Sequence, residues 1–86
     1  MQVTFLGTGS ALPIPGRVQT GMLLERGQQQ LLIDCGSGVL TRLSDTDVGY
    51  EGISTVLLTH HHLDHVADLL PLMKARWLAG KDAIEI

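Results

Sequence analysis

All four histidines of this 86-residue chain stand in one stretch, Thr59-His60-His61-His62-Leu63-Asp64-His65. The apolar run 56–58 before it is continuous, which predicts a strand over 54–58 that is covered on both faces. After the stretch, the apolar residues recur with helical spacing and predict an amphipathic helix whose buried face is Val66, Leu69, Leu70, Met73 and Trp77. Pro71 should kink this helix or delay its start, and Gly80 should end it. The histidines therefore join a strand to a helix, which indicates an α/β fold.

The rest of the chain predicts short strands separated by glycines. A strand over 2–6 leads into a long loop at 7–20, and two runs at 21–25 and 30–34 have the spacing of a β-hairpin. The pattern at 39–43 favours a short helix, and 44–52 is polar and typical of a surface connection. The last four residues resemble the opening of a further strand.

Composition limits the classes of protein that this chain can represent. Its length predicts one domain spanning 1–86, and 44% hydrophobic with 17% charged residues is typical of a globular chain. No apolar run is long enough for a membrane span. The net charge is −3 without a basic cluster, so this segment lacks the charge pattern of a nucleic-acid binder. No basic region follows Met1, which predicts a cytoplasmic location, and the single Cys35 is interpreted as a small buried hydrophobe.

The histidine stretch has the chemistry of a metal site. In an extended segment alternate side chains point the same way, so His60 and His62 can converge on one metal while His61 points away. Asp64 and His65 can face a second position nearby. Imidazole and carboxylate suit zinc, and also manganese or iron. Four ligands within six residues cannot easily surround one ion, which favours two metals about 3.5–4 Å apart. The alternative is a degenerate site that no longer binds metal.

The motif His60-x-His62-x-Asp64-His65 resembles the HxHxDH signature of the metallo-β-lactamase fold superfamily. The stretch Phe5-Leu6-Gly7-Thr8-Gly9-Ser10 with Pro13, and Ile33-Asp34-Cys35-Gly36, are similar to ribonuclease Z-like proteins. This resemblance implies the N-terminal half of a four-layer αββα sandwich with two metals, commonly zinc. It implies that His60 and His62 bind the first metal and that Asp64 and His65 bind the second. It also implies that Asp34 supports the metal loop without being a ligand, although a turn or helix cap explains an aspartate there equally well.

Two differences from the family narrow the functional prediction. The continuation Gly36-Ser37-Gly38-Val39-Leu40 and the presence of Leu63 depart from ribonuclease Z enzymes, which weakens tRNA processing as the specific activity. The family also needs two more histidines and a bridging aspartate, and every histidine here is already in the cluster. We therefore predict the first half of a metal-dependent, phosphodiesterase-like hydrolase, in which Asp64 is catalytic because it orients the attacking hydroxide.

The partners follow from the same hypothesis. The substrate is expected to be a small molecule or another phosphodiester, with RNA unsupported by the charge. Half of a sandwich would leave an apolar face and unpaired strand edges, so a homo-oligomer or a complementary C-terminal half is the expected partner. The alternative hypothesis is a metal-binding or self-associating module without catalysis.

Overall fold

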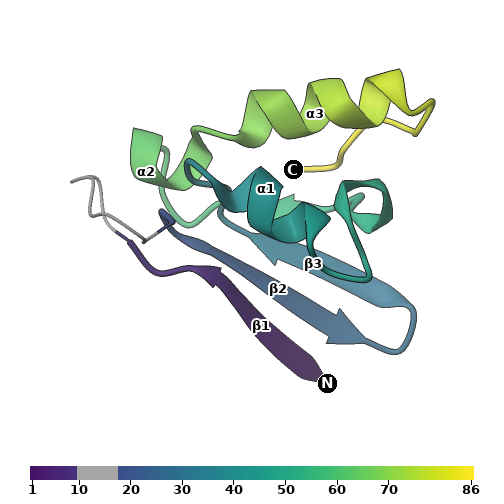
Figure 1. Ribbon diagram of the computed structural model, residues 1–86, viewed down its shortest axis with the longest axis horizontal. Coiled ribbons are helices and arrows are strands. Elements are labelled where there is room, and N and C mark those ends of the chain that lie inside the picture. Colours follow the sequence, from purple (N-terminus) through teal and green to yellow (C-terminus); the bar gives the residue numbers. More distant parts are fainter. Residues whose placement is uncertain (10–17) are drawn as a thin grey trace.

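The computed structural model describes residues 1–9 and 18–86, and it shows one sheet with helices beside it (Figure 1). The strands lie in the order β1-β2-β3-β4 and are β1 (Gln2–Gly7), β2 (Gly21–Arg26), β3 (Gln29–Ile33) and β4 (Val56–Leu57). The helices are α1 (Val39–Ser44), the 3-10 turn η1 (Tyr50–Gly52), α2 (Leu63–Val66) and α3 (Leu69–Leu78). The predicted α/β class is confirmed. Ser10 and Pro13 of the amino-terminal motif lie outside the described residues.

The first three strands form an antiparallel meander, and β4 joins β3 in parallel through the segment that contains α1 and η1. The predicted hairpin is present, with a tight turn at Gly27 and Gln28 between β2 and β3. Gly27 has φ +60°, a left-handed conformation that glycine adopts without steric cost. The predicted short helix is α1. Beside β4, Glu85 forms an isolated parallel bridge with Thr55, where the sequence predicted the opening of a strand.

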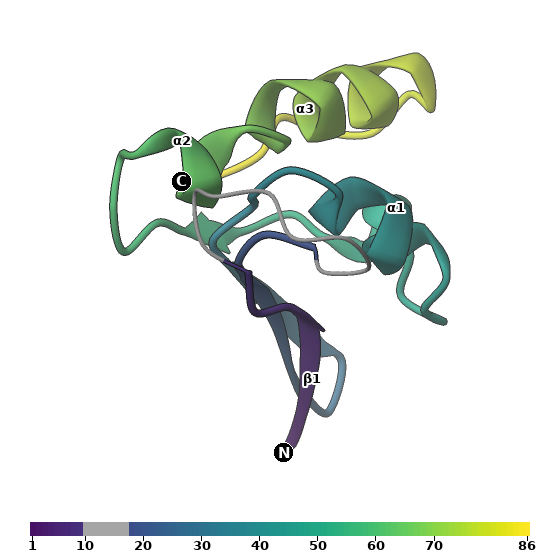
Figure 2. The ribbon, with the colours of Figure 1, turned by 60° about the vertical axis from the view of Figure 1, so that its left-hand side comes forward.

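The helices cover one face of the sheet, as the two ribbon views show (Figures 1 and 2). Because side chains alternate along a strand, this face receives every second residue. The buried apolar core consists of Leu6, Leu23, Leu32, Cys35, Val39, Leu43, Ile53, Val56 and Leu72. Cys35 is fully buried, as expected of a small hydrophobe. In the described part of the chain, no helix is long and apolar enough to cross a membrane.

The opposite face of the sheet is apolar, and it is exposed in the part of the chain that the structure describes. Paired positions on the four strands make a row of Phe5, Met22, Ile33 and Leu57, which we call the outer row. Phe5 is 65% exposed and Leu57 is 52% exposed. The prediction of a strand covered on both faces over 54–58 was therefore wrong for this chain. Val56 faces the helices, whereas its neighbour Leu57 points to the side on which the described residues place nothing.

The segment after His62 forms two helices instead of one, and His65 lies in the first of them, α2. Pro71 is the third residue of α3, within the first turn, where backbone N–H groups have no partner inside the helix and a proline costs little. The long helix α3 thus starts at Leu69 and not at Val66, in agreement with the delay predicted from Pro71. Gly80 follows the end of α3 with φ +75°, which confirms it as the stop signal.

The predicted buried face of this helix was wrong in part. Leu69 packs against the core, as predicted. Leu70 is 73% exposed and Trp77 is 68% exposed, whereas Leu72 and Arg76 are buried. Arg76 is held by backbone carbonyl groups that its guanidinium reaches, with Nη1 donating to the oxygens of Tyr50 (3.2 Å) and Glu51 (2.8 Å). A charged residue with such partners can occupy a buried position that a hydrophobicity pattern assigns to the solvent.

Candidate functional site

The histidine stretch leaves β4 as an irregular segment and ends in α2, so the carboxyl end of a strand positions it, as in many α/β proteins. His60, His61 and His62 are exposed, and Asp64 and His65 are partly buried. The ring centres of His60 and His65 are 4.7 Å apart, and those of His60 and His62 are 6.0 Å apart. The structure thus brings His60 and His65 together and leaves His62 farther out.

Asp34 lies beneath this segment at the end of β3. It is buried and has φ +63°, a left-handed conformation that aspartate tolerates better than most residues. Its Oδ1 accepts the backbone N–H of Thr59 at 2.8 Å, and its Oδ2 accepts the Thr59 hydroxyl at 2.7 Å. Nδ1 of His65 lies 2.9 Å from the same Oδ2. Asp34 therefore contacts the start and the end of the histidine stretch, so a purely local turn or cap role does not describe it.

The contacts of Asp34 favour its ionised form. Burial raises the pKa of this carboxyl, but the hydrogen bonds from Thr59 and the contact with His65 lower it by more, so the pKa lies below its ordinary value. A carboxylate can only accept hydrogen bonds, so Asp34 can accept one from the Nδ1 side of His65. The other ring nitrogen, Nε2, lies 3.5 Å from Oδ2 of Asp64.

The donor chemistry of these residues fits a metal, but the described residues form pairs and not a closed site. Within residues 1–9 and 18–86, no group of three or more His, Cys, Asp or Glu side chains is gathered closely enough to hold an ion. The pairs are His60 with His65 and Asp64 with His65. His61 is exposed and its ring packs edge-on against His62 at 5.2 Å, away from these pairs.

Two positions matter to the site that sequence reasoning did not assign to it. Gly36 packs so tightly against the histidine stretch that a Cβ there would overlap the carbonyl oxygen of Asp64 and lie 2.7 Å from Cβ of Gln19. The second is Asp68, which sends its carboxylate to the start of α1. For Gly36, the sequence signal was the presence of a glycine between Asp34 and Gly38. No sequence signal links residue 68 to residue 38.

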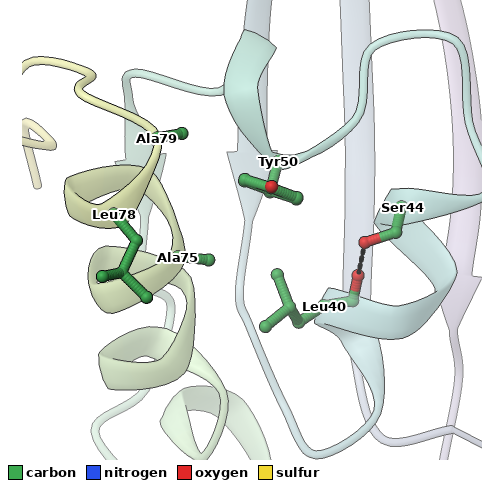
Figure 3. A pocket seen from close by; sticks show the side chains of 6 residues that line it. All are labelled: Leu40, Ser44, Tyr50, Ala75, Leu78 and Ala79. Carbon is green, nitrogen blue, oxygen red and sulfur yellow. Dashed lines mark hydrogen bonds between the residues drawn. The ribbon is translucent and has the colours of Figure 1, made fainter.

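A separate hollow lies between α1, η1 and α3, away from the histidines (Figure 3). It has a volume of about 300 Å³ and is lined by Leu40, Ser44, Tyr50, Ala75, Leu78 and Ala79. The Ser44 hydroxyl already donates to the Leu40 carbonyl at 2.9 Å. The lining contains no His, Cys, Asp or Glu, so the hollow offers none of the chemistry of the histidine stretch.

Known proteins resemble this chain in sequence and in fold. A family model described as Anti-Pycsar protein Apyc1 matches residues 1–83. A ribonuclease Z of Mycobacterium avium is 48% identical over 79 residues, which are 92% of this chain and 28% of that protein. The metallo-β-lactamase fold protein YhfI from Bacillus subtilis superimposes with a TM-score of 0.84 at 37% identity, over 91% of this chain and 32% of its own.

Human tRNase Z, short form, is as similar, with a TM-score of 0.83 and 37% identity over 91% of this chain and 30% of its own. The chain thus spans about three tenths of the length of these relatives. The resemblance inferred from the HxHxDH motif is confirmed by relatives found with the whole sequence and with the fold. This chain therefore belongs to the Anti-Pycsar protein Apyc1 family, and it resembles the N-terminal portion of ribonuclease Z-like proteins with the metallo-β-lactamase fold.

Proposed function

We propose that this chain, as one folded unit over 1–86, supplies the first part of a dinuclear metal centre in a hydrolase of phosphodiester bonds. His60 and His62 hold one metal, Asp64 and His65 hold the second, and Asp34 supports them without being a ligand. Zinc is the proposed ion, with manganese and iron as alternatives. The remaining ligands belong to a complementary C-terminal half.

The observation that carries this proposal is the contact between Asp34 and His65. A histidine that binds a metal usually donates its other ring N–H to a carboxylate or carbonyl, which fixes the tautomer and the ring orientation. Here Nδ1 of His65 faces Asp34 at 2.9 Å, and Nε2 faces Asp64 at 3.5 Å. This arrangement supports His65 as a ligand prepared before any metal arrives.

The chemistry proposed for the chain is hydrolytic. When bound, a metal pair lowers the pKa of water and stabilises negative charge on a phosphoryl oxygen. Asp64 orients the attacking water by accepting a hydrogen bond from it. Asp34 orients the ring of His65 through Nδ1, so that Nε2 is the nitrogen that would bind the metal. His61 has no role in this proposal, and its exposed ring packs edge-on against His62.

The proposed substrate is a phosphodiester. Relatives named ribonuclease Z and tRNase Z favour RNA as the substrate class. Against this, the chain has a net charge of −3, and its six Lys and Arg residues form no cluster in the sequence. A small phosphodiester is therefore the alternative, and an RNA substrate would need basic residues from the complementary half.

Zinc content after dialysis tests the metal centre. We expect the wild-type chain to retain zinc, and His60→Ala and His62→Ala to retain less. His61→Ala is the matched control, because it removes an imidazole from the same exposed stretch and should retain as much zinc as the wild type. Loss of zinc in His61→Ala equal to that in His60→Ala, or no zinc in the wild type, would contradict the proposal. Hydrolysis of bis-p-nitrophenyl phosphate by this chain alone should be weak, because only part of the ligand set is present.

A metal-binding or self-associating module without catalysis is the second candidate function, and the outer row favours it. Phe5 and Leu57 expose apolar surface across the edges of the sheet, and such surface commonly marks a protein contact. Light scattering over a range of concentrations measures this. A stable oligomer without bound metal would favour this function, whereas a monomer at high concentration would contradict it.

A further inference from the structure

We propose that Asp68 is a positioning residue for His65, holding the histidine stretch against the segment 34–40; this inference rests on the proposed metal centre. Oδ2 of Asp68 accepts the backbone N–H groups of Gly38 at 2.9 Å and Leu40 at 3.0 Å. These two groups lie at the start of α1, where N–H groups have no partner within the helix. The two hydrogen bonds converge on one oxygen atom, so Asp68 anchors its own segment to the start of α1.

The anchor is the counterpart of the one made by Asp34. The segment 34–40 sends the Asp34 carboxylate to Thr59 and His65, and the segment 59–68 sends the Asp68 carboxylate back to Gly38 and Leu40. Each segment thus supplies one carboxylate to the other. Two stretches that are about 25 to 30 residues apart in sequence are joined at both ends.

Backbone hydrogen bonds connect the two anchors. The N–H of Cys35 donates to the carbonyl of His65 at 2.7 Å, and the N–H of Asp68 donates to the carbonyl of Cys35 at 2.9 Å. His65 is therefore held by its ring at Asp34, by its carbonyl at Cys35, and through Asp68, three residues later and between α2 and α3. We call the two backbone hydrogen bonds of Cys35 the ladder. Removing the Asp68 carboxylate frees one end of this ladder, so the ring of His65 should lose part of its fixed orientation.

A role in holding the segments differs from a role as a ligand. Both bonds end on a single oxygen, Oδ2, so the amide oxygen of asparagine can accept both without a charge. Asp68→Asn should therefore keep the position of His65. Asp68→Glu keeps the charge but moves the carboxylate oxygen by one methylene group. This variant should therefore displace His65. If Asp68 acted as a ligand or through its charge, the order of these two variants would be reversed.

The test compares Asp68→Ala, Asp68→Asn and Asp68→Glu with the wild type in two measurements. Amide hydrogen exchange at Cys35 in the metal-free protein reports the ladder, and competition with a chelator reports the dissociation constant for zinc. The matched control is Thr46→Ala, because the Thr46 hydroxyl donates to the Leu43 carbonyl at 2.7 Å and stabilises the other end of α1. This control separates a loss of helix stability from a loss of positioning.

We expect Asp68→Ala to exchange the Cys35 amide faster and to bind zinc about 10–100-fold more weakly, as is usual for residues that orient ligands. Asp68→Asn should lie near the wild type, Asp68→Glu near alanine, and Thr46→Ala should change neither measurement. Unchanged exchange in Asp68→Ala, or zinc binding that is weaker in Asp68→Asn than in Asp68→Glu, would overturn the inference. If Asp68→Ala does not fold, the order of the other two variants decides. If the wild type binds no zinc, the proposed metal centre is wrong. Hydrogen exchange at Cys35 in the metal-free variants then still tests whether Asp68 positions His65.

Discussion

Replacing Gly36 by alanine tests whether the histidine stretch is held by close packing. The added Cβ would overlap the carbonyl oxygen of Asp64 and lie 2.7 Å from Cβ of Gln19, and neither is the end of a flexible side chain. Gly36 itself cannot retreat freely, because its N–H donates to the Thr20 carbonyl at 3.0 Å and its carbonyl accepts the Val39 N–H at 3.1 Å. Either the segment 34–40 or the histidine stretch must move.

The size of the effect follows from the cost of overpacking. Forcing a methyl group into a filled position costs about 1–3 kcal/mol, and contact with backbone on both sides places Gly36→Ala near the upper end. For a domain of this size, about 2–3 kcal/mol corresponds to a fall in the melting temperature of roughly 10–20 °C. The displacement of Asp64 should also weaken zinc binding. Thermal denaturation followed by circular dichroism, with the chelator competition described above, measures both effects.

Gly80→Ala is the control for this experiment. Gly80 has φ +75° and open space around it, so alanine costs about 1 kcal/mol of left-handed strain and should leave zinc binding unchanged. A Gly36→Ala protein that melts within a few degrees of the wild type would refute the packing argument. Equal losses of zinc binding in both variants would show that general destabilisation, and not the contact with Asp64, controls the site.

Three further predictions concern Asp34, Cys35 and Phe5. Asp34→Ala should lose about 2–3 kcal/mol of stability in urea denaturation, because it leaves the N–H and hydroxyl of Thr59 without their acceptor. Asp34→Asn should recover part of this loss. Equal stability of the wild type and the alanine variant would contradict the prediction. Burial, with a smaller contribution from the charge of Asp68, raises the pKa of the Cys35 thiol to about 12. Iodoacetamide at pH 8 should therefore modify this thiol only in denaturant. Rapid modification of the folded chain would show that the core around Cys35 opens. Phe5→Glu should reduce the apparent mass in light scattering without lowering the melting temperature, since Phe5 is 65% exposed; an unchanged oligomer would place the contact elsewhere.

The elements that sequence predicted well are those set by local signals. Gly27 marks the hairpin, Gly80 ends α3, and Pro71 delays its start, and each acts through the backbone of its own neighbourhood. The HxHxDH motif likewise predicted the family, because its spacing is itself a local pattern. These predictions needed no knowledge of which segments meet in the fold.

The errors occurred where the outcome depends on distant partners. The helical pattern was continued through Ala67 and Asp68, but the break between α2 and α3 changes the direction of every later side chain, so Leu70 and Trp77 face outward. Arg76 is buried because carbonyls of η1 receive its guanidinium, and no sequence pattern identifies carbonyl partners. The two-sided burial of the 54–58 strand failed for a similar reason, since the described residues contain nothing that covers Leu57.

The candidate site contains two kinds of residue, and substitutions of the two kinds should have different effects. These effects distinguish a metal centre from a structural cluster. His60 and His62 are exposed, so replacing them should change metal binding with little effect on folding. Asp34, Gly36 and Asp68 join the two segments of the fold, so replacing them should change stability and metal binding together. A purely structural cluster would not show this division, because its exposed histidines would affect neither quantity. The pattern across these five positions therefore distinguishes a metal centre built into the fold from histidines that the fold merely exposes.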